Sequence, residues 1–168
     1  MTLSIKPLEG VGKVKFGMSS HEISEILSKT PSKFYRIIGL EPQTDAYFNS
    51  SFQIDYNNKG ECVFIEISSN KNYDVLFNGI NVFKTNAQDL IKITSKVEDY
   101  DHNHPELGFS YIFLKLELSL WRERDRDKYF TTIGVGNKGY FSKPNLERKK
   151  EIETAIYNMT HTRFGKVT

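Results

Sequence analysis

The chain has 168 residues, of which 38% are hydrophobic, and it contains 12 phenylalanines and 9 tyrosines. This length suits one domain, and the many aromatic residues favour strands, because large rings pack well on a pleated sheet. The 23 basic and 21 acidic residues leave a formal net charge of +2. A balance this even excludes a strong overall field that would attract nucleic acid or an anionic membrane, so we expect neither as a partner.

The amino-terminal segment lacks the long apolar run of a signal peptide, and no stretch is long and apolar enough to span a bilayer. The one cysteine, Cys62, has no second thiol with which to pair and falls in a strand-like pattern. Such cysteine usage suits a reducing compartment. We therefore expect a cytoplasmic protein.

The first clear pattern in chain order is a strand, a glycine turn and a helix over residues 12–27. Ser19 and Glu22 have the spacing of a capping box, in which the serine side chain accepts the N–H of residue 22 and the glutamate accepts the N–H of residue 19. Met18 and Ile23 lie at the two positions of a hydrophobic staple. These signals predict a short helix that begins directly after Ser19.

Two hairpins follow. Residues 52–56 and 62–67 carry strand patterns on either side of the turn at 57–60, and the second strand is apolar on both faces, which is typical of a central strand. Asn78 and Gly79 predict the turn of another hairpin, because this pair accommodates positive φ angles.

The remaining elements complete an α+β fold. A second short helix begins near Asn86, with strands between residues 109 and 135 and a longer amphipathic helix over residues 146–163. We expect a mainly antiparallel sheet of about six to eight strands, with the two short helices and the longer carboxyl-terminal helix packed on it. Residues 1–168 are expected to form a single domain, in which 1–141 make the α+β core and 142–168 the carboxyl-terminal helix and tail.

Histidines and carboxylates crowd the polar segment before residue 107. His102 and His104 lie beside Asp99, Asp101 and Glu106, a set that could supply nitrogen and oxygen ligands to zinc or a general acid and base. The sequence contains no second group of ligands and no serine in a nucleophile elbow. A small enzyme that uses the two histidines is therefore an alternative, while the main expectation is a protein with no enzymatic activity, cofactor or metal.

The aromatic strands suggest another alternative, a sheet on which single-stranded nucleic acid stacks. Against this alternative, the rings alternate along the strands as core residues do. Acidic neighbours also neutralise the basic residues that a nucleic-acid groove needs.

The polar segment from residue 98 to residue 106 is also a candidate for contact with another protein. Its aromatic residue could anchor such a contact, while its four acids could meet cations in a basic cleft. The candidate contact residues are Glu98, Asp99, Tyr100, Asp101 and Glu106.

Several short motifs carry a resemblance to a known group of proteins. They are Gly12 with Phe16-Gly17-Met18-Ser19 and Glu22, then Phe77-Asn78-Gly79-Ile80, Leu118-Ser119-Leu120-Trp121-Arg122, and Ile133-Gly134-Val135 with Gly139-Tyr140-Phe141. In these motifs the chain resembles the immunity proteins of polymorphic toxin and contact-dependent growth inhibition systems, small bacterial proteins found beside secreted toxins. The resemblance implies stoichiometric binding of the carboxyl-terminal domain of a cognate toxin, such as a nuclease, and neutralisation of that toxin in the cell.

Overall fold

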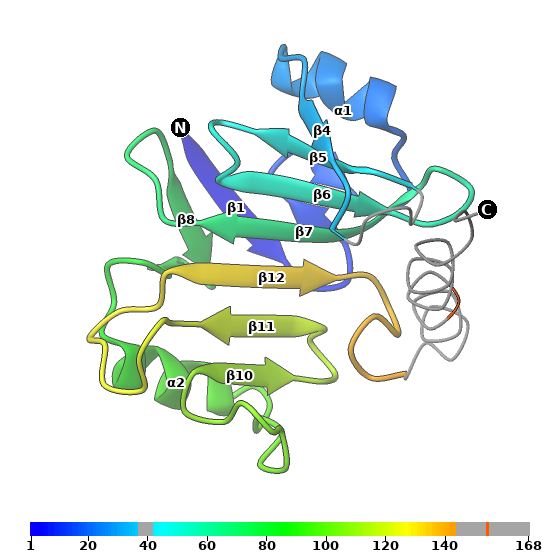
Figure 1. Ribbon diagram of the computed structural model, residues 1–168. Helices are drawn as coiled ribbons and strands as arrows, with labels where there is room; N and C mark the ends of the chain where they lie inside the picture. The colour runs from blue at the N-terminus through cyan, green and yellow to red at the C-terminus, as the bar shows by residue number, and fades with distance from the viewer. Residues whose placement is uncertain (37–41, 144–153, 155–168) are drawn as a thin grey trace, which may run out of the picture.

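The computed structural model describes residues 1–36, 42–143 and 154, and this part of the chain forms two sheets and two helices (Figure 1). The larger sheet consists of β4 (Ser32–Phe34), β5 (Thr44–Tyr47), β6 (Phe52–Tyr56), β7 (Cys62–Ser68), β10 (Ser110–Phe113), β11 (Leu118–Trp121) and β12 (Thr132–Gly136). Its order is β10-β11-β12-β7-β6-β5-β4, and all neighbouring strands are antiparallel. The predicted hairpin of β6 and β7 is confirmed, and β7 is a central strand as expected.

The smaller sheet consists of β1 (Thr2–Lys6), β2 (Gly10–Val11), β3 (Val14–Lys15), β8 (Asp74–Phe77) and β9 (Ile80–Asn81). Its order is β3-β2-β1-β8-β9, and only the pair of β1 and β8 is parallel. The α+β class and the mainly antiparallel pairing are confirmed, but the strands divide between two sheets where one was expected. The smaller sheet is held together by the pairing of β1 with β8, in which Thr2 lies opposite Asp74, and no local pattern encodes this long-range pairing.

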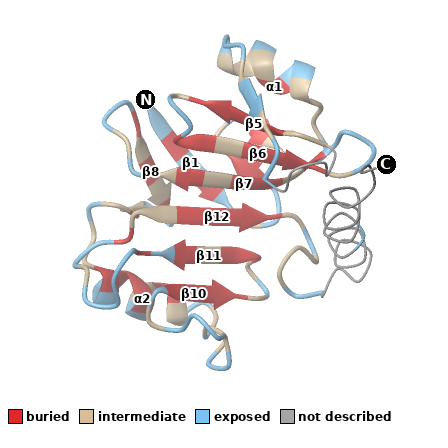
Figure 2. Ribbon diagram, viewed as in Figure 1, coloured by how far each residue is buried: buried red, intermediate tan, exposed pale blue. Residues whose placement is uncertain are grey.

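The two sheets share one buried core, and the smaller sheet lies behind the larger one in Figure 1. We call the side of the larger sheet that contributes to this core its inner face. Ile65, Leu120 and Ile133 lie on the inner face and are at most 1% exposed. Because successive residues of a strand point to opposite sides, Glu66 and Ser119 belong to the opposite, outer face. Figure 2 shows buried residues along the strands and exposed residues in the connecting loops.

The first helix, α1 (Ser20–Leu27), begins with the predicted capping box. The backbone N–H of Glu22 donates to Ser19 Oγ at 3.3 Å, and the N–H of Ser19 donates to a Glu22 carboxylate oxygen at 2.8 Å. Ile23 is fully buried, as a staple position requires. The local sequence therefore fixes both where this helix starts and which side it buries.

The second helix, α2 (Ala87–Ser95), is capped by Asn86, whose side-chain oxygen accepts the N–H of Gln88 at 3.0 Å. Leu90 of this helix reaches the shared core. Neither helix of the described residues has the length and apolar character to cross a membrane. The longer helix expected over residues 146–163 lies, apart from Thr154, outside the described residues.

Candidate functional site

The acidic segment singled out in the sequence forms a loop along the edge of the larger sheet. This loop, residues 98–107, connects the end of α2 with β10, the outermost strand. The N–H of Asp101 donates to the carbonyl of Ile112 in β10 at 2.8 Å. At the other end of the loop, the N–H of Ser110 donates to the carbonyl of Glu106 at 2.9 Å. The loop is therefore attached to the sheet at both ends of β10.

Two of the five candidate contact residues hold this loop in place. The Glu98 carboxylate accepts the backbone N–H groups of Lys115 and Leu116, at distances between 2.7 and 2.9 Å, in the turn between β10 and β11. The Tyr100 ring packs against the core, with its centroid 5.0 Å from that of Tyr111 in an edge-to-face arrangement. The sequence predicts Glu98 and Tyr100 as contact residues. In the structure both side chains have partners within the chain.

The other three candidate residues carry carboxylates at the surface of the loop. The Asp99 side chain is 68% exposed, and Glu106 is also exposed. The Asp101 carboxylate accepts the N–H of Asn103 at 2.9 Å in a local turn. A hydrogen bond from His102 lowers the pKa of Asp99, which keeps this carboxylate ionised at neutral pH. The loop thus presents three negative charges on a backbone held by internal hydrogen bonds.

The two histidines of the loop have separate partners. The His102 ring nitrogen Nε2 lies 3.0 Å from an Asp99 oxygen, and its ring centroid lies 4.3 Å from that of Tyr100. His104 Nδ1 instead accepts the backbone N–H of Glu106 at 3.3 Å. The described residues contain no group of three or more histidine, cysteine or carboxylate side chains arranged to hold a metal ion. This geometry gives the enzyme alternative no support.

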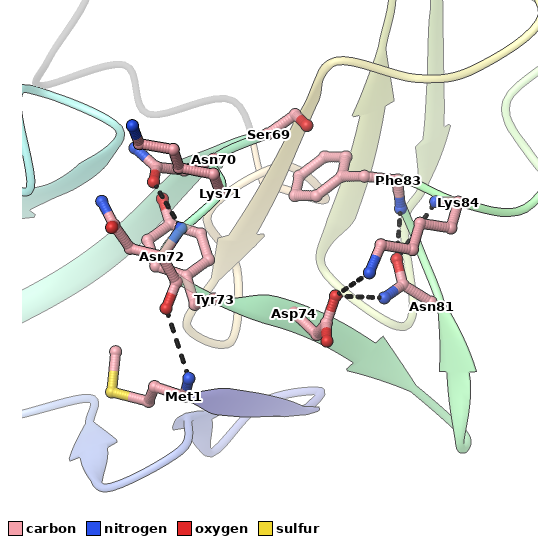
Figure 3. A pocket seen from close by; sticks show the side chains of 10 residues that line it. All are labelled: Met1, Ser69, Asn70, Lys71, Asn72, Tyr73, Asp74, Asn81, Phe83 and Lys84. Atoms are coloured by element: carbon pink, nitrogen blue, oxygen red, sulfur yellow. Dashed lines mark hydrogen bonds and ion pairs between the residues drawn. The ribbon is translucent and has the colours of Figure 1, made fainter.

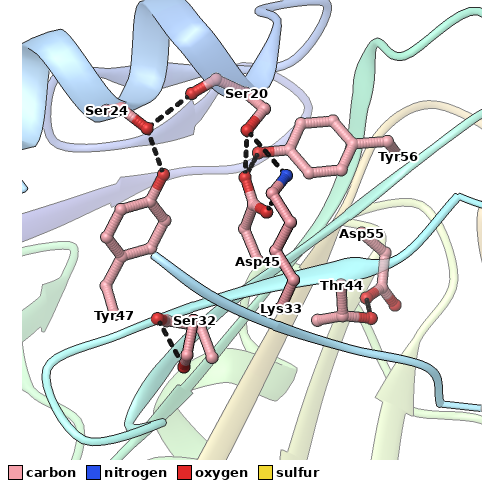
Figure 4. Close-up of polar contacts among 10 residues, drawn as sticks. Ser20, Ser24, Ser32, Lys33, Thr44, Asp45, Tyr47, Asp55 and Tyr56 are labelled. Carbon is pink, nitrogen blue, oxygen red and sulfur yellow. Dashed lines mark hydrogen bonds and ion pairs between the residues drawn. The ribbon is translucent and has the colours of Figure 1, made fainter. Parts of the chain in front are cut away.

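A polar cluster beneath α1 brings a serine, a lysine and a buried carboxylate together (Figure 4). Asp45 is fully buried, one of its oxygens lies 2.8 Å from Lys33 Nζ, and the other accepts hydrogen bonds from Tyr56, at 2.7 Å, and from Ser20. Lys33 Nζ also donates to Ser20 Oγ at 3.3 Å.

Serine, lysine and carboxylate groups in contact can form a nucleophile and its base. In this cluster, however, the Lys33 ammonium is the ion-pair partner of the buried Asp45 carboxylate, and a protonated lysine cannot accept the proton of Ser20. Burial, followed by the hydrogen bond to Asp45, raises the pKa of Tyr56, which keeps the phenol neutral. We therefore regard the cluster as a structural connection that joins α1 to β4, β5 and β6.

A polar pocket lies between the segment after β7 and the segment after β9 (Figure 3). Its carboxylate, Asp74, accepts hydrogen bonds from Lys84 Nζ at 2.6 Å and from Asn81 Nδ2 at 2.9 Å. These two partners, Lys84 first, lower the pKa of Asp74. The pairing neutralises the carboxylate within the pocket itself, so its charge is not available to a ligand.

The outer face of the larger sheet tests the nucleic-acid alternative. On this face the side chain of Arg36 donates through Nε to both Asp55 carboxylate oxygens at 2.8 Å. Its Nη1 lies 3.7 Å from a Glu66 carboxylate oxygen. The two carboxylates outnumber this cation, so the group as a whole repels phosphate. The arrangement therefore provides no cationic groove at this position.

Trp121 is a candidate functional residue, although its sequence context indicates it only as part of a motif. It ends β11 and is 38% exposed, whereas Leu118 and Leu120 of the same strand are buried. Leu118 and Leu120 occupy even positions of the strand and Trp121 an odd one. Because odd and even positions face opposite sides of a strand, this pattern could have predicted an outward-facing indole.

Comparisons of this chain with protein-family models, with curated proteins and with solved structures give no match. Function must therefore be inferred from the residues and their geometry.

Proposed function

We propose that this chain is an immunity protein, which binds the carboxyl-terminal domain of a cognate bacterial toxin in the cytoplasm and neutralises it by stoichiometric contact. The motif resemblance motivates this proposal. The structural observation that supports it is the acidic loop, in which Asp99, Asp101 and Glu106 are displayed on a backbone held by Glu98 and Tyr100. The proposed partner is a nuclease-type toxin, because a domain that cleaves nucleic acid needs a cationic cleft.

A rigid acidic loop favours such a contact for two physical reasons. Its conformation is set before binding, so association does not have to order a flexible segment at the interface. Its charges also steer a basic partner toward the loop, which raises the association rate and suppresses wrong partners.

We include in this proposal a carboxyl-terminal helix over residues 146–163 that packs on the sheet.

The direct test is co-expression with the toxin domain encoded by the neighbouring gene, with cell survival and a purified one-to-one complex as readouts. We expect full protection by the wild-type chain. The double charge reversal Asp99→Lys with Asp101→Lys should slow association at low salt by about tenfold. Exposed charges at the edge of an interface act mainly on the association rate. The difference in association rate between the variant and the wild-type chain should therefore shrink as salt is added.

A matched control is the double reversal Glu9→Lys with Glu25→Lys, which changes the net charge equally. Both side chains are exposed, at 64% and 68%, and lie away from the acidic loop. This control should leave protection unchanged. If the wild-type chain neither protects the cell nor forms a complex, the proposed function is wrong. If the chain protects and both double variants associate equally fast, the acidic loop is not the contact.

A further inference from the structure

We infer that Trp121 is the apolar anchor of the contact with the toxin domain, and that the outer face around it and the acidic loop form one continuous interface. This inference rests on the proposed function and names the centre of its binding surface.

The first observation is the exposure of the indole within an ordered strand. Trp121 pairs on one side with Ser110 of β10 and on the other with Thr132 of β12. Neither side chain is large enough to cover an indole, and Trp121 remains 38% exposed. Tryptophan is among the residues that contribute most binding energy when a partner buries them, and its ring has few torsions to immobilise.

The second observation is the flat surface beside the indole. Beyond Thr132 the next residue across the sheet is Ser68, and Ser119 lies on the same face of β11 as Trp121. These short side chains let a partner approach the sheet next to the indole, whereas the Phe64 ring already covers Gly134, which lies opposite Ser119. The surface thus combines one projecting ring with an adjoining row of short polar side chains.

The third observation is the continuity between Trp121 and the acidic loop. Ser110 is paired with Trp121 and at the same time donates its backbone N–H to the carbonyl of Glu106 at 2.9 Å. Ser110 therefore links Trp121 to the Glu106 end of the loop, and Asp101 follows along the same edge, where its N–H donates to the carbonyl of Ile112 at 2.8 Å. A partner that covers the indole at this edge meets those carboxylates at the rim of the same interface.

The charges around Trp121 indicate a basic protein as the occupant. The tip at residues 123–128 carries three acidic and three basic side chains and is neutral. Arg122 is only 3% exposed and directs its guanidinium to the carbonyls of Gly108 and Asp127. Arg122 thus keeps one positive charge, which the carboxylates of Asp99, Asp101 and Glu106 outnumber, so the local field is negative. A negative field disfavours nucleic acid and a second copy of this chain, and it favours a cationic toxin domain.

Arg122 also makes the anchor rigid. Its guanidinium lies 5.8 Å from the Tyr111 ring centroid and 5.5 Å from that of Phe130. These contacts, together with its two backbone carbonyl partners, fix the end of β11 immediately after Trp121. The indole is thus attached to a backbone that does not have to be ordered on binding.

The chain contains one tryptophan, so a single spectroscopic signal tests the inference. The chain is labelled with 5-fluorotryptophan and titrated with the unlabelled, catalytically inactivated toxin domain. We expect the one ¹⁹F resonance to shift on binding. We also expect the broadening of this resonance by a dissolved paramagnetic agent to fall. Trp121→Ala should weaken binding by about 30-fold or more, as expected for an interface anchor.

The matched control is Leu8→Ala, which truncates another exposed apolar side chain, 45% exposed, in the turn between β1 and β2, and should change affinity less than about twofold. If the toxin domain binds but neither the resonance nor the Trp121→Ala affinity changes, the inference is overturned and the proposed function stands. If the toxin domain does not bind, the proposed function fails, and the inference fails with it. A shift produced by the chain's own concentration, or by a single-stranded oligonucleotide, would overturn the inference in favour of self-association or nucleic-acid binding.

Discussion

Glu117 offers the sharpest test of how the larger sheet holds the segment that follows it. Its side chain is 2% exposed and lies in the turn between β10 and β11. One carboxylate oxygen accepts the N–H of Gly139 at 2.8 Å and the hydroxyl of Ser142, and the other accepts the N–H groups of Phe141 at 2.6 Å and Ser142 at 3.3 Å. Glu117 also has a φ of 50°, an unfavourable angle for any residue with a side chain.

The substitution Glu117→Gln keeps the size of the side chain and replaces one oxygen with a donor. With the new amide group beside Ser142, whose hydroxyl can accept from it, the hydrogen bond from the N–H of Gly139 is lost, and the N–H groups of Phe141 and Ser142 donate to a neutral acceptor in place of a charged one. At about 1.5 kcal/mol for the lost bond and about 0.75 kcal/mol for each weakened bond, the free energy of unfolding should fall by about 3 kcal/mol. For a chain of this size the Tm should fall by about 6–12 °C.

Denaturant unfolding followed by circular dichroism measures this change, and hydrogen exchange reports directly on the amides of Gly139 and Phe141. Both amides should lose protection in the variant. The exposed residue Glu123 provides the control, because Glu123→Gln should alter the free energy of unfolding by less than about 0.5 kcal/mol. A Glu117→Gln protein that matches wild type in stability and in exchange at both amides would refute the role assigned to the carboxylate.

Four further predictions concern the fold. Ser19→Ala should lower the free energy of unfolding by about 1 kcal/mol in denaturant titrations, since it removes the cap of α1. Hydrogen bonds from Ser19 hold the pKa of Glu22 below its usual value of 4.5. Ionised Glu22 therefore stabilises the fold above pH 4.5, and this contribution is lost as the pH falls through the pKa that Glu22 has in the folded chain. Glu22→Gln should reduce the dependence of Tm on pH in that range. Cys62 is 1% exposed, and burial, and secondarily the charge of Asp55, raise the pKa of its thiol to about 12. A thiol reagent should therefore label Cys62 at neutral pH only in molecules that have unfolded. Gly134→Ala should destabilise the fold by about 1–3 kcal/mol in thermal unfolding, because the new methyl group would lie 2.8 Å from the Phe64 ring.

Local signals predicted the elements whose stabilising partners are close in sequence. The capping box of α1 joins Ser19 to Glu22, three residues away, and both of its hydrogen bonds are present. Asn78 and Gly79 have φ angles of 50° and 77°, as the predicted hairpin turn requires. In each case the residues that determine the structure are neighbours along the chain, so the pattern could be recognised without the fold.

The second sheet could not be predicted in this way. Strands β2, β3 and β9 have two residues each, too few for an alternating pattern to be visible. The parallel pairing of β1 with β8 depends on a contact between distant segments, in which Leu3 lies opposite Val75.

The candidate site shows the same limit. Composition identified the acidic loop, but it could not separate Glu98 from Asp99, because the partners of Glu98 are backbone groups of Lys115 and Leu116 in another turn.

The strand β4, at the opposite edge of the larger sheet from β10, contains a residue that hinders pairing with strands of other molecules. Lys33 in β4 lies opposite Asp45 and points to the inner face, toward the buried carboxylate. A foreign strand that extended the ladder beside β4 would take this ammonium further from water, and lysines turned inward on edge strands hinder such additions. The edge at β4 is therefore unfavourable for pairing with a strand of another molecule, which opposes fibrous growth from this side of the sheet.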